Sequence, residues 1–188
     1  MSTTNVLASP PLTLAPSLPS ASPAAFQSAM RYLAAGCSII ATADGGERMG
    51  LTATAVCSVT AEPPRLLVCV NRDVRAHAGI MASGTLGVNV LSDAQESLAK
   101  RFAGMVKDVR GEDRFLDGVW TDGALGAPLL ADALASFDCR VVEKVRASTH
   151  TIFICEVMNA QAASDPESGP LIFFNRTFAS LKSAVPNQ

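Results

Sequence analysis

The side chains that could do chemistry in this sequence are few and lie far apart. Two histidines and five cysteines are spread over 188 residues, and no CxxC pair or clustered Cys/His spacing points to a metal site. No Ser-His-Asp or Cys-His order stands out, and no pair of carboxylates is set within an apolar segment. Covalent and hydrolytic mechanisms therefore lack support, and we expect no metal.

The segment GLTATAVCSVT, residues 50–60, is unusually rich in small and hydroxyl side chains. Small side chains let a flat ligand approach the backbone, and N–H and hydroxyl groups can serve the polar edge of such a ligand. The same composition also suits a threonine-rich strand on the polar face of a barrel. The segment alone does not decide between a ligand site and a strand face.

A phosphate site is one reading of the segment Asn71-Arg72-Asp73-Val74-Arg75, which follows an apolar strand and precedes a helix. One amide and two guanidinium groups then lie near a helix N-terminus, which favours phosphate. The alternative is a surface turn with salt-bridged arginines, and on this motif alone the turn is favoured.

His150 comes directly before a strongly apolar strand. A histidine at the mouth of a strand can position or polarise a ligand, although a lone histidine is more often structural. His77 lies inside a predicted helix, and we expect it to be a surface residue.

Periodicity and turn residues predict the elements that position these side chains. Ser22-Pro23 predicts the start of a helix over residues 23–35, and Asp44-Gly45-Gly46-Glu47 predicts a hairpin between strands 38–43 and 49–60. Further along, the sequence predicts a strand at 66–70, a helix at 74–82, a strand at 85–91, a helix from 92 or 93 to 103, and strands at 134–145, 151–158 and 171–174.

Residues 104–130 are rich in glycine, with Phe115 and Trp120 isolated, and predict a mostly irregular surface segment. Many strands with short links and few helices favour an antiparallel β-barrel with peripheral helices over a βαβ repeat. No GxGxxG and no GxxxxGK occurs, so neither a Rossmann turn nor a P-loop is available.

Composition excludes several classes of protein. With 48% hydrophobic and 17% charged residues, the chain fits one globular domain, and a net charge of -2 without a basic cluster argues against nucleic acid. The apolar runs fall far short of the roughly 20 residues of a membrane span. An odd number of cysteines in apolar stretches predicts reduced, mostly buried thiols in a cytoplasmic protein.

Three regions are expected along the chain. Residues 1–22 are uncharged and rich in Pro, Ser and Ala, which predicts a flexible tail rather than a secretory signal. Residues 23–183 form the expected domain, and residues 184–188 form a short C-terminal tail.

The ordered motifs of this sequence resemble those of the short-chain flavin reductase family, the small components of two-component flavin monooxygenases. The sequence is similar to two subgroups, the reductase of 4-hydroxyphenylacetate monooxygenase and the pyrimidine-utilisation flavin reductase. The resemblance runs over about residues 26–181, and its motifs are residues 26–30, 50–60 with 63–64, 67–72, 88–91, 101–104, 114–115, 136–139, 149–150 and 171–174 with Arg176.

The resemblance implies a mainly β fold, an FMN-binding split β-barrel of antiparallel Greek-key form, assembled as a homodimer. It implies an oxidoreductase that passes a hydride from NADH or NADPH to FMN or FAD and supplies reduced flavin to a separate monooxygenase. The alternative is a flavin-binding module of the same fold, or a reductase of a ferric or corrinoid acceptor, with little turnover of free flavin.

The resemblance also assigns roles to individual positions. His150 matches a family histidine near the nicotinamide and is the expected catalytic residue, although Ser148 replaces the glycine that precedes it in the family. The isoalloxazine and ribityl chain are expected at Thr52, Ala53, Thr54, Ala55 and Ser58, the ribityl-phosphate end at Asn71, Arg72 and Asn89, flavin cover at Phe102 to Gly104, and the nicotinamide groove at Phe174 and Arg176.

Overall fold

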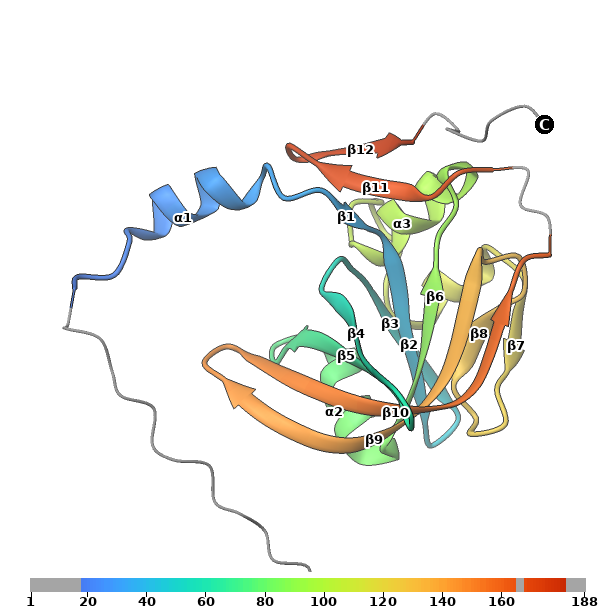
Figure 1. Ribbon diagram of the computed structural model, residues 1–188. Helices are drawn as coiled ribbons and strands as arrows, with labels where there is room; N and C mark the ends of the chain where they lie inside the picture. The colour runs from blue at the N-terminus through green and yellow to red at the C-terminus, as the bar shows by residue number, and fades with distance from the viewer. Residues whose placement is uncertain (1–17, 165–167, 182–188) are drawn as a thin grey trace, which may run out of the picture.

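The computed structural model describes residues 18–164 and 168–181 (Figure 1). Most of the tail expected at 1–22, and all of the one expected at 184–188, lie outside these described residues, so both remain predictions. Residues 18–22 are described, and they are exposed without helix or strand.

Seven antiparallel strands form the main sheet, in the order β3-β2-β6-β9-β10-β5-β4. The longest pair is the hairpin of β9 and β10, whose tip projects to the left in Figure 1. The strands are β2 (Ser38–Asp44), β3 (Glu47–Ala53), β4 (Val56–Ala61), β5 (Pro64–Asn71), β6 (Thr85–Val90), β9 (Ala135–Ala147) and β10 (His150–Ala162).

Alternating burial explains why the apolar segments form strands of this sheet. Along β5, Leu66, Val68 and Val70 are buried while the residues between them are half-buried. Val68 pairs across the sheet with Phe153 of β10, which is also fully buried. Because successive side chains of a strand point to opposite faces, this register places one face of β5 in the core.

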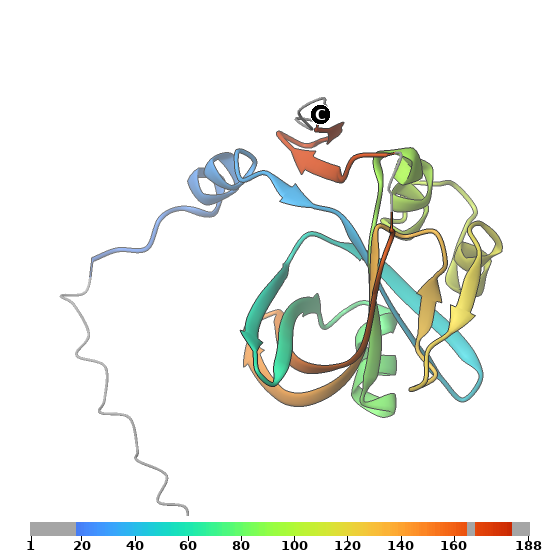
Figure 2. The same ribbon diagram turned by 45° about the vertical axis from the view of Figure 1, so that its right-hand side comes forward.

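Two small sheets complete the β structure. One contains β1 (Ala35–Gly36), β11 (Leu171–Phe174) and β12 (Thr177–Ser180), and the other is a hairpin of β7 (Trp120–Asp122) and β8 (Pro128–Leu130). Figure 2 shows the β11–β12 hairpin above the curled main sheet and the β7–β8 hairpin at its side.

The helices differ in how firmly they pack. Helix α2 (Arg75–Ser83) contacts β2 and β3 and ends at Gly84, which has a φ of 70°. Helix α3 (Glu96–Phe102) follows the 3₁₀ turn η1 (Asp93–Gln95), where Ser92 and Gln95 form a capping box. Helix α1 (Pro23–Met30) has no buried residue and stands away from the sheet in both views (Figures 1 and 2).

The buried side chains form two clusters. One centres on Val68 and Phe153, beside α2, and the other includes Leu91, Phe102 and Leu171, beneath α3 and β11. Each fully buried large apolar side chain contributes about 1.5–3 kcal/mol, so the two clusters hold the helices that line the candidate site.

The helix predicted over residues 23–35 is shorter than expected. It ends at Met30, and the backbone oxygen of Arg31 then accepts a hydrogen bond from the nitrogen of Asn175 at 2.7 Å. This contact turns the chain so that β1 pairs with β11. The apolar side chains that indicated the helix are Phe26, Met30 and Leu33, which are 58%, 44% and 63% exposed.

Residues 104–130 are more ordered than the glycine content predicts. They contain the 3₁₀ helix η2 (Gly111–Leu116) and the β7–β8 hairpin. Phe115 and Trp120 are not isolated, because their rings pack together at 4.9 Å and both contact the ring of Phe102. Long-range aromatic packing, which local sequence cannot reveal, orders this segment.

The strand predicted over residues 49–60 breaks at Thr54 and Ala55. Its two halves, β3 and β4, become opposite edges of the main sheet, and within the described part of the chain they do not pair with each other.

The prediction of a mainly β fold with peripheral helices is confirmed. No helix among the described residues is long and apolar enough to cross a membrane.

The structure has all five cysteines as free thiols, and their burial is mixed. Cys37, Cys139 and Cys155 are buried, and burial raises the pKa of Cys37 to about 11 and that of Cys155 to about 12. Cys69 is half-buried and Cys57 is exposed on β4. The thiols are thus mostly buried, as predicted, and Cys57 is the exposed one because its side chain lies on the open face of an edge strand.

Candidate functional site

A cavity of about 320 Å³ lies where β3, α2, α3 and η2 meet. We call it the arginine pocket because two guanidinium groups, those of Arg75 and Arg114, are part of its wall. The lining residues are Met49, Gly50, Leu51, Thr52, Val74, Arg75, Ala76, Phe102, Ala103, Gly111 and Arg114.

Arg114 is held in this wall by backbone groups rather than by an acid. Its Nη1 donates to the carbonyl oxygens of Gly50 and Phe102 at 3.1 and 3.2 Å. Burial lowers the pKa of its guanidinium, with a smaller contribution from Arg110. Among the described residues no carboxylate forms an ion pair with Arg114, and its buried Nε has no hydrogen-bond partner. An uncompensated cation of this kind favours an anionic ligand.

Hydrogen bonds to the backbone of η2, together with close packing against Gly104, fix the position of Arg114. The side chain of Arg101 donates to the carbonyl oxygens of Arg114 and Asp113 at 3.1 and 2.7 Å, which ties η2 to α3. A Cβ built on Gly104 would lie 3.5 Å from Nη2 of Arg114, and Gly104 has a φ of 74°. The guanidinium is therefore positioned before any ligand binds.

Arg75 supplies the second cation at the first residue of α2. Its Nη2 lies 2.6 Å from Oε1 of Glu47, and a Cβ built on Gly111 would lie 3.5 Å from its Nη1. The N-cap residue of this helix is Val74, which has no side-chain acceptor, so no side chain caps the first N–H groups. The positive end of the helix dipole therefore adds to the two guanidinium charges.

The floor of the arginine pocket depends on a close contact between β3 and α3. A Cβ on Gly50 would lie 2.8 Å from Cε1 of Phe102, so only glycine lets the ring pack against the strand. The hydroxyl of Thr52 donates to the carbonyl oxygen of Ala99 at 2.6 Å. These contacts leave backbone of β3 bordering the cavity.

A second hollow of about 520 Å³ lies between α1, the β3–β4 link and the turn of the β11–β12 hairpin. We call it the aromatic groove, and most of its surface is apolar. The lining residues are Phe26, Gln27, Met30, Arg31, Leu33, Ala35, Thr54, Ala55, Phe173 and Arg176.

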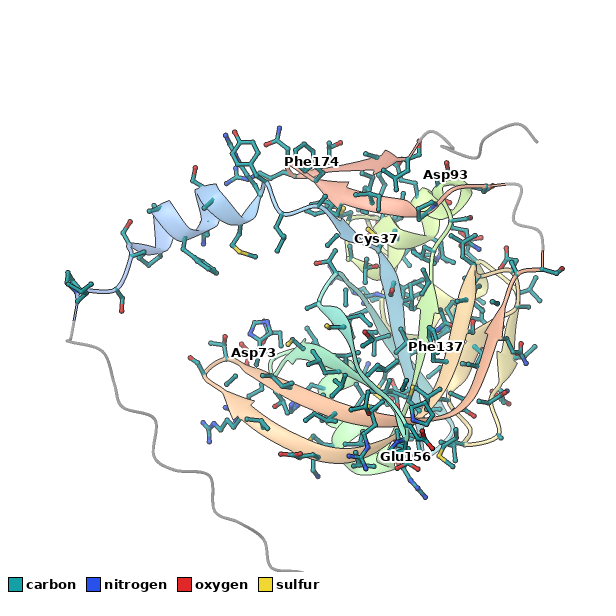
Figure 3. The ribbon with its side chains drawn as sticks, in the orientation of Figure 1. Cys37, Asp73, Asp93, Phe137, Glu156 and Phe174 are labelled. Carbon is teal, nitrogen blue, oxygen red and sulfur yellow. The ribbon has the colours of Figure 1, made fainter. Side chains whose placement is uncertain are left out.

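Aromatic and guanidinium groups stack at one edge of the aromatic groove. The ring of Tyr32 meets that of Phe174 edge-on at 6.2 Å, and Cζ of Arg31 lies 4.6 Å above the Tyr32 ring. Figure 3 shows Phe174 on β11 near the end of α1. Asn175 and Arg176 form the turn with positive φ values of 49° and 67°. A flat, partly charged ligand suits such a surface.

The segment Thr52 to Ala55 connects the two hollows. Thr52 lines the arginine pocket, Thr54 and Ala55 line the aromatic groove, and Ala53 between them is almost fully buried. An extended ligand that followed this segment would place an anionic end beside Arg75 and Arg114 and a flat end beside Thr54 and Ala55.

His150 lies at the tip of the β9–β10 hairpin and is exposed. Its Nδ1 lies 2.9 Å from the hydroxyl of Thr149, and its Cα pairs with that of Asn71 at the end of β5. Ser148 in the turn has a φ of 51°, a conformation that glycine adopts at no cost. Figure 3 shows Asp73 beside this tip.

A third hollow, the tip pocket, borders the same hairpin. It is lined by Arg72, Asp73, His77, Arg146, Ser148 and Thr149. The backbone nitrogen of Arg72 donates to the carbonyl oxygen of Thr149 at 2.9 Å. Nε2 of His77 lies 2.8 Å from the hydroxyl of Thr151, and burial, followed by the charge of Arg72, lowers the pKa of His77. His77 is therefore half-buried and not the surface residue that its helix position predicted.

The structure brings together only part of the expected set of site residues. Thr52, Phe102 and Gly104 lie at the arginine pocket, and Thr54, Ala55 and Arg176 lie at the aromatic groove with Phe174 at its edge. Ser58 lines a different surface on β4, and Arg72 belongs to the tip pocket. Asn71 lines none of these three hollows, and its side chain accepts from the nitrogen of Asp73 at 3.0 Å.

Asn89 lies in the core, where it cannot hold a phosphate. It is fully buried, its Oδ1 accepts from the nitrogen of Leu130 at 2.7 Å and from the hydroxyl of Ser136, and its Nδ2 donates to the carbonyl oxygen of Ile39. Its amide joins β6 to its neighbours, because a buried polar side chain must satisfy its hydrogen bonds inside the protein.

Sequence reasoning missed the roles of Arg114, Arg31 and Tyr32. The segment 71–75 did indicate guanidinium groups near a helix N-terminus, but Arg75 rather than Arg72 reaches the arginine pocket. Arg114 approaches β3 through contacts some 64 residues apart in the chain, which no local pattern encodes.

Among the described residues no group of three His, Cys, Asp or Glu side chains could hold a metal.

Comparison with known proteins gives a consistent result. The family described as flavin reductase like domain matches residues 30–182. The chain is 41% identical over 162 residues to a protein of Pseudomonas syringae pv. syringae named FMN reductase (NADH) RutF, which covers 86% of this chain and 88% of the relative.

Solved structures of similar fold include two reductases. The NADH:FAD oxidoreductase SgcE6 of Streptomyces globisporus C-1027 is 30% identical, with a TM-score of 0.74 covering 83% of this chain and 90% of that one. BorF, the flavin reductase component of a bacterial two-component tryptophan halogenase, is 28% identical, with a TM-score of 0.75 covering 84% of this chain and 97% of that one.

Proposed function

This chain belongs to the flavin reductase family, and we propose from this premise that it reduces FMN with NADH and supplies the reduced flavin to a separate monooxygenase. The relative of 41% identity is named an NADH-dependent FMN reductase, and BorF is the reductase component of a two-component system. The observation that carries the proposal is the two-ended site along β3.

The two ends of this site suit the two ends of a flavin mononucleotide. The ribityl phosphate is an anion, and Arg75, Arg114 and the uncapped end of α2 provide positive charge for it. The isoalloxazine is flat and largely apolar, which suits the groove beside Thr54, Ala55 and Phe173. The residues present therefore fit the flavin, with its phosphate beside Arg114 rather than beside Asn89.

The flavin, when bound, supplies the hydride-accepting chemistry, so the protein has to orient and shield rather than to react. The short side chains from Ala53 to Ala55 let the backbone approach a flat ring. Arg31 and Arg176, which line the aromatic groove, offer positive charge for the co-substrate. Hydride transfer to a flavin requires no nucleophile and base from the protein, and the sequence offers no clear pair of this kind.

His150 is proposed to orient the nicotinamide. Its Nδ1 is engaged with the hydroxyl of Thr149, which leaves Nε2 to face a ligand. The ring is exposed at the hairpin tip, on the same side of the sheet as Asn71. Thr149 is thus the residue that sets the orientation of the imidazole.

A homodimer of split β-barrels is part of the proposal. The edge strands β3 and β4 are unpaired with each other, and the apolar side of α1 has no cover in a single chain. A second apolar surface lies on the face of β10, β5 and β4 that points away from the core, formed by Cys57, Leu67, Cys69, Ile152 and Ile154. A second copy would cover such surfaces, which monomers rarely expose. Sedimentation equilibrium should therefore give twice the mass of one chain.

A cytoplasmic location completes the proposal. The five free cysteines include two that are not fully buried, which is compatible with a reducing compartment. NADH is likewise a co-substrate of the cell interior.

The test is anaerobic oxidation of NADH and NADPH by the purified protein with FMN, FAD or riboflavin, followed by the loss of nicotinamide absorbance. We expect NADH oxidation that depends on added FMN and that shows saturation with FMN. Tight flavin binding without NADH oxidation would instead favour a flavin-binding module, and NADH oxidation only with a ferric or corrinoid acceptor would favour a reductase of that acceptor.

A further inference from the structure

Two ion pairs cross one end of the arginine pocket. Nε of Arg48 lies 2.8 Å from Oε1 of Glu112, and Nη2 of Arg75 lies 2.6 Å from Oε1 of Glu47. The Arg48 guanidinium also lies 4.9 Å from the centre of the Phe115 ring, so its position is fixed from two sides. The hydrogen bond from Arg48 lowers the pKa of Glu112 below that of an ordinary glutamate.

These pairs lie at the end of the pocket that faces away from the aromatic groove. Glu47 and Arg48 are the first two residues of β3, before the lining residues Met49 to Thr52, whereas the groove begins beyond Thr52, at Thr54. Glu112 follows Gly111, which lines the pocket from η2. The ion pairs thus join β3 to η2 and to α2 as a rim around the phosphate end.

We infer that this rim, and the Arg48–Glu112 pair above all, restricts the bound flavin to the mononucleotide. The inference rests on the proposed function and adds a determinant of flavin choice. FAD continues beyond the first phosphate into a second phosphate and an adenosine. On this account the extension continues past the rim, where it meets the paired side chains of Arg48 and Glu112 and of Arg75 and Glu47.

Both steric and electrostatic effects act in the same direction. The cavity of about 320 Å³ is small for a ligand pocket, so an adenosine beyond the ribityl phosphate would have to extend outside it. Glu112 neutralises the Arg48 guanidinium, so this pair offers the second phosphate no net positive charge. FMN ends at its single phosphate, which meets Arg75, Arg114 and the start of α2 without passing beyond the two ion pairs.

Glu112 is the better residue to change, because Glu47 is paired with Arg75. Loss of Glu47 would alter a guanidinium that contacts the phosphate, so FMN binding would change as well. The Glu112 and Arg48 side chains are 47% and 33% exposed, and exposed ion pairs contribute little to stability. Glu112→Ala should therefore fold normally and open the rim from the side of η2.

Glu96→Ala is the matched control. Glu96 forms an exposed ion pair with Lys100 on α3, with 43% of its side chain exposed, and it is not part of the arginine pocket. Both variants remove one glutamate and one surface ion pair. They differ in whether that ion pair lies on the rim.

The experiment measures equilibrium dissociation constants of FMN and FAD by flavin fluorescence for the full-length wild type, Glu112→Ala, Glu96→Ala and Arg48→Ala. We expect the wild type to prefer FMN, and the ratio of FAD to FMN dissociation constants to fall roughly five- to tenfold in Glu112→Ala, the range for one unfavourable charge near a partly exposed site. Arg48→Ala leaves the Glu112 carboxylate without its cationic partner, so it should lower the ratio less than Glu112→Ala does, and Glu96→Ala should leave it unchanged.

Two outcomes would overturn the inference while leaving the proposed function intact. One is a wild type that reduces FMN but binds FAD equally well. The other is a ratio that moves less than twofold in Glu112→Ala, or that moves equally in Glu96→Ala. A wild type that binds neither flavin and oxidises no NADH would overturn the proposed function, and the inference with it.

Discussion

The two ends of the candidate flavin site are built in opposite ways. The arginine pocket is enclosed by β3, α2, α3 and η2, and its key side chain, Arg114, is fixed by backbone carbonyl groups. The aromatic groove depends on α1, which has no buried residue, and on a short hairpin. One end is therefore complete within a single chain, whereas the other exposes apolar side chains that a second copy could cover.

This difference indicates that the two ends of the site have different roles in binding. A preformed charged pocket binds an anion without ordering cost, so it can provide affinity for the flavin. An open groove allows the nicotinamide to enter and leave, so it can serve exchange of the co-substrate. Substitutions in the arginine pocket should mainly alter flavin binding. Substitutions near the tip of the β9–β10 hairpin should mainly alter the use of NADH.

The largest effect is expected from Arg114→Met, which keeps much of the side-chain volume but removes the charge. A hydrogen bond to a charged group is worth about 1.5–3 kcal/mol, so the dissociation constant of FMN should rise roughly 10- to 100-fold. Riboflavin, which lacks the phosphate, should bind the variant and the wild type alike. Isothermal titration with both flavins checks this.

Arg110→Met is the control for that variant, because Arg110 is exposed and does not line the pocket. Arg114→Met would contradict a phosphate site in the arginine pocket if it weakened the binding of FMN and of riboflavin equally. The lost affinity would then reflect packing and not phosphate binding.

A smaller effect is expected from His150→Gln at the hairpin tip. Loss of the imidazole should lower kcat/KM for NADH by roughly tenfold, in the range of one lost hydrogen bond, while FMN binding stays within about twofold. Steady-state kinetics with varied NADH, together with flavin titration, separates the two. Equal loss of NADH use and FMN affinity would remove His150 from the nicotinamide site.

Ser148→Gly should act on stability. Ser148 has a φ of 51°, and a non-glycine residue in this region carries strain that glycine avoids. Part of the gain is offset by the greater freedom of glycine in the unfolded chain, so we expect a rise of about 0.5–1 kcal/mol in the free energy of unfolding. Denaturant titration measures it, and a decrease would show that the turn holds serine without strain.

The smallest effect is expected from Cys57→Ala. Cys57 is exposed on β4 and lines neither the arginine pocket nor the aromatic groove. Flavin affinity and turnover should stay within about twofold of the wild type, as for an ordinary surface substitution. A variant that binds FMN normally but cannot reduce it would give this thiol a redox role that its position does not suggest.

The alternation of apolar side chains along the sequence predicted the strands in which buried and less buried residues alternate, such as β5 and β10. The strands around Val68 and Phe153 alternate as their burial requires, and the fold class follows from them. Helix α1 was extended too far because its apolar spacing, including Leu33, is helical although nothing in one chain covers it. Periodicity reports a buried face but not which partner buries it.

The site was predicted less completely, for a related reason. Thr54, Ala55 and Arg176 were expected, since family motifs mark them, and they do line one groove. Asn89 was assigned to the phosphate because it matches a family motif, yet tertiary contacts use its amide in the core. Arg114 gains its position from Gly50 and Phe102, which are brought to it only by folding.

The most direct test is a crystal structure of the protein with FMN. We expect the phosphate within hydrogen-bond distance of Arg75 and Arg114, and the isoalloxazine against Thr54 and Ala55 at the aromatic groove. A phosphate bound instead by Arg72 and Arg146 in the tip pocket, or a ring inside the arginine pocket, would contradict the two-ended site.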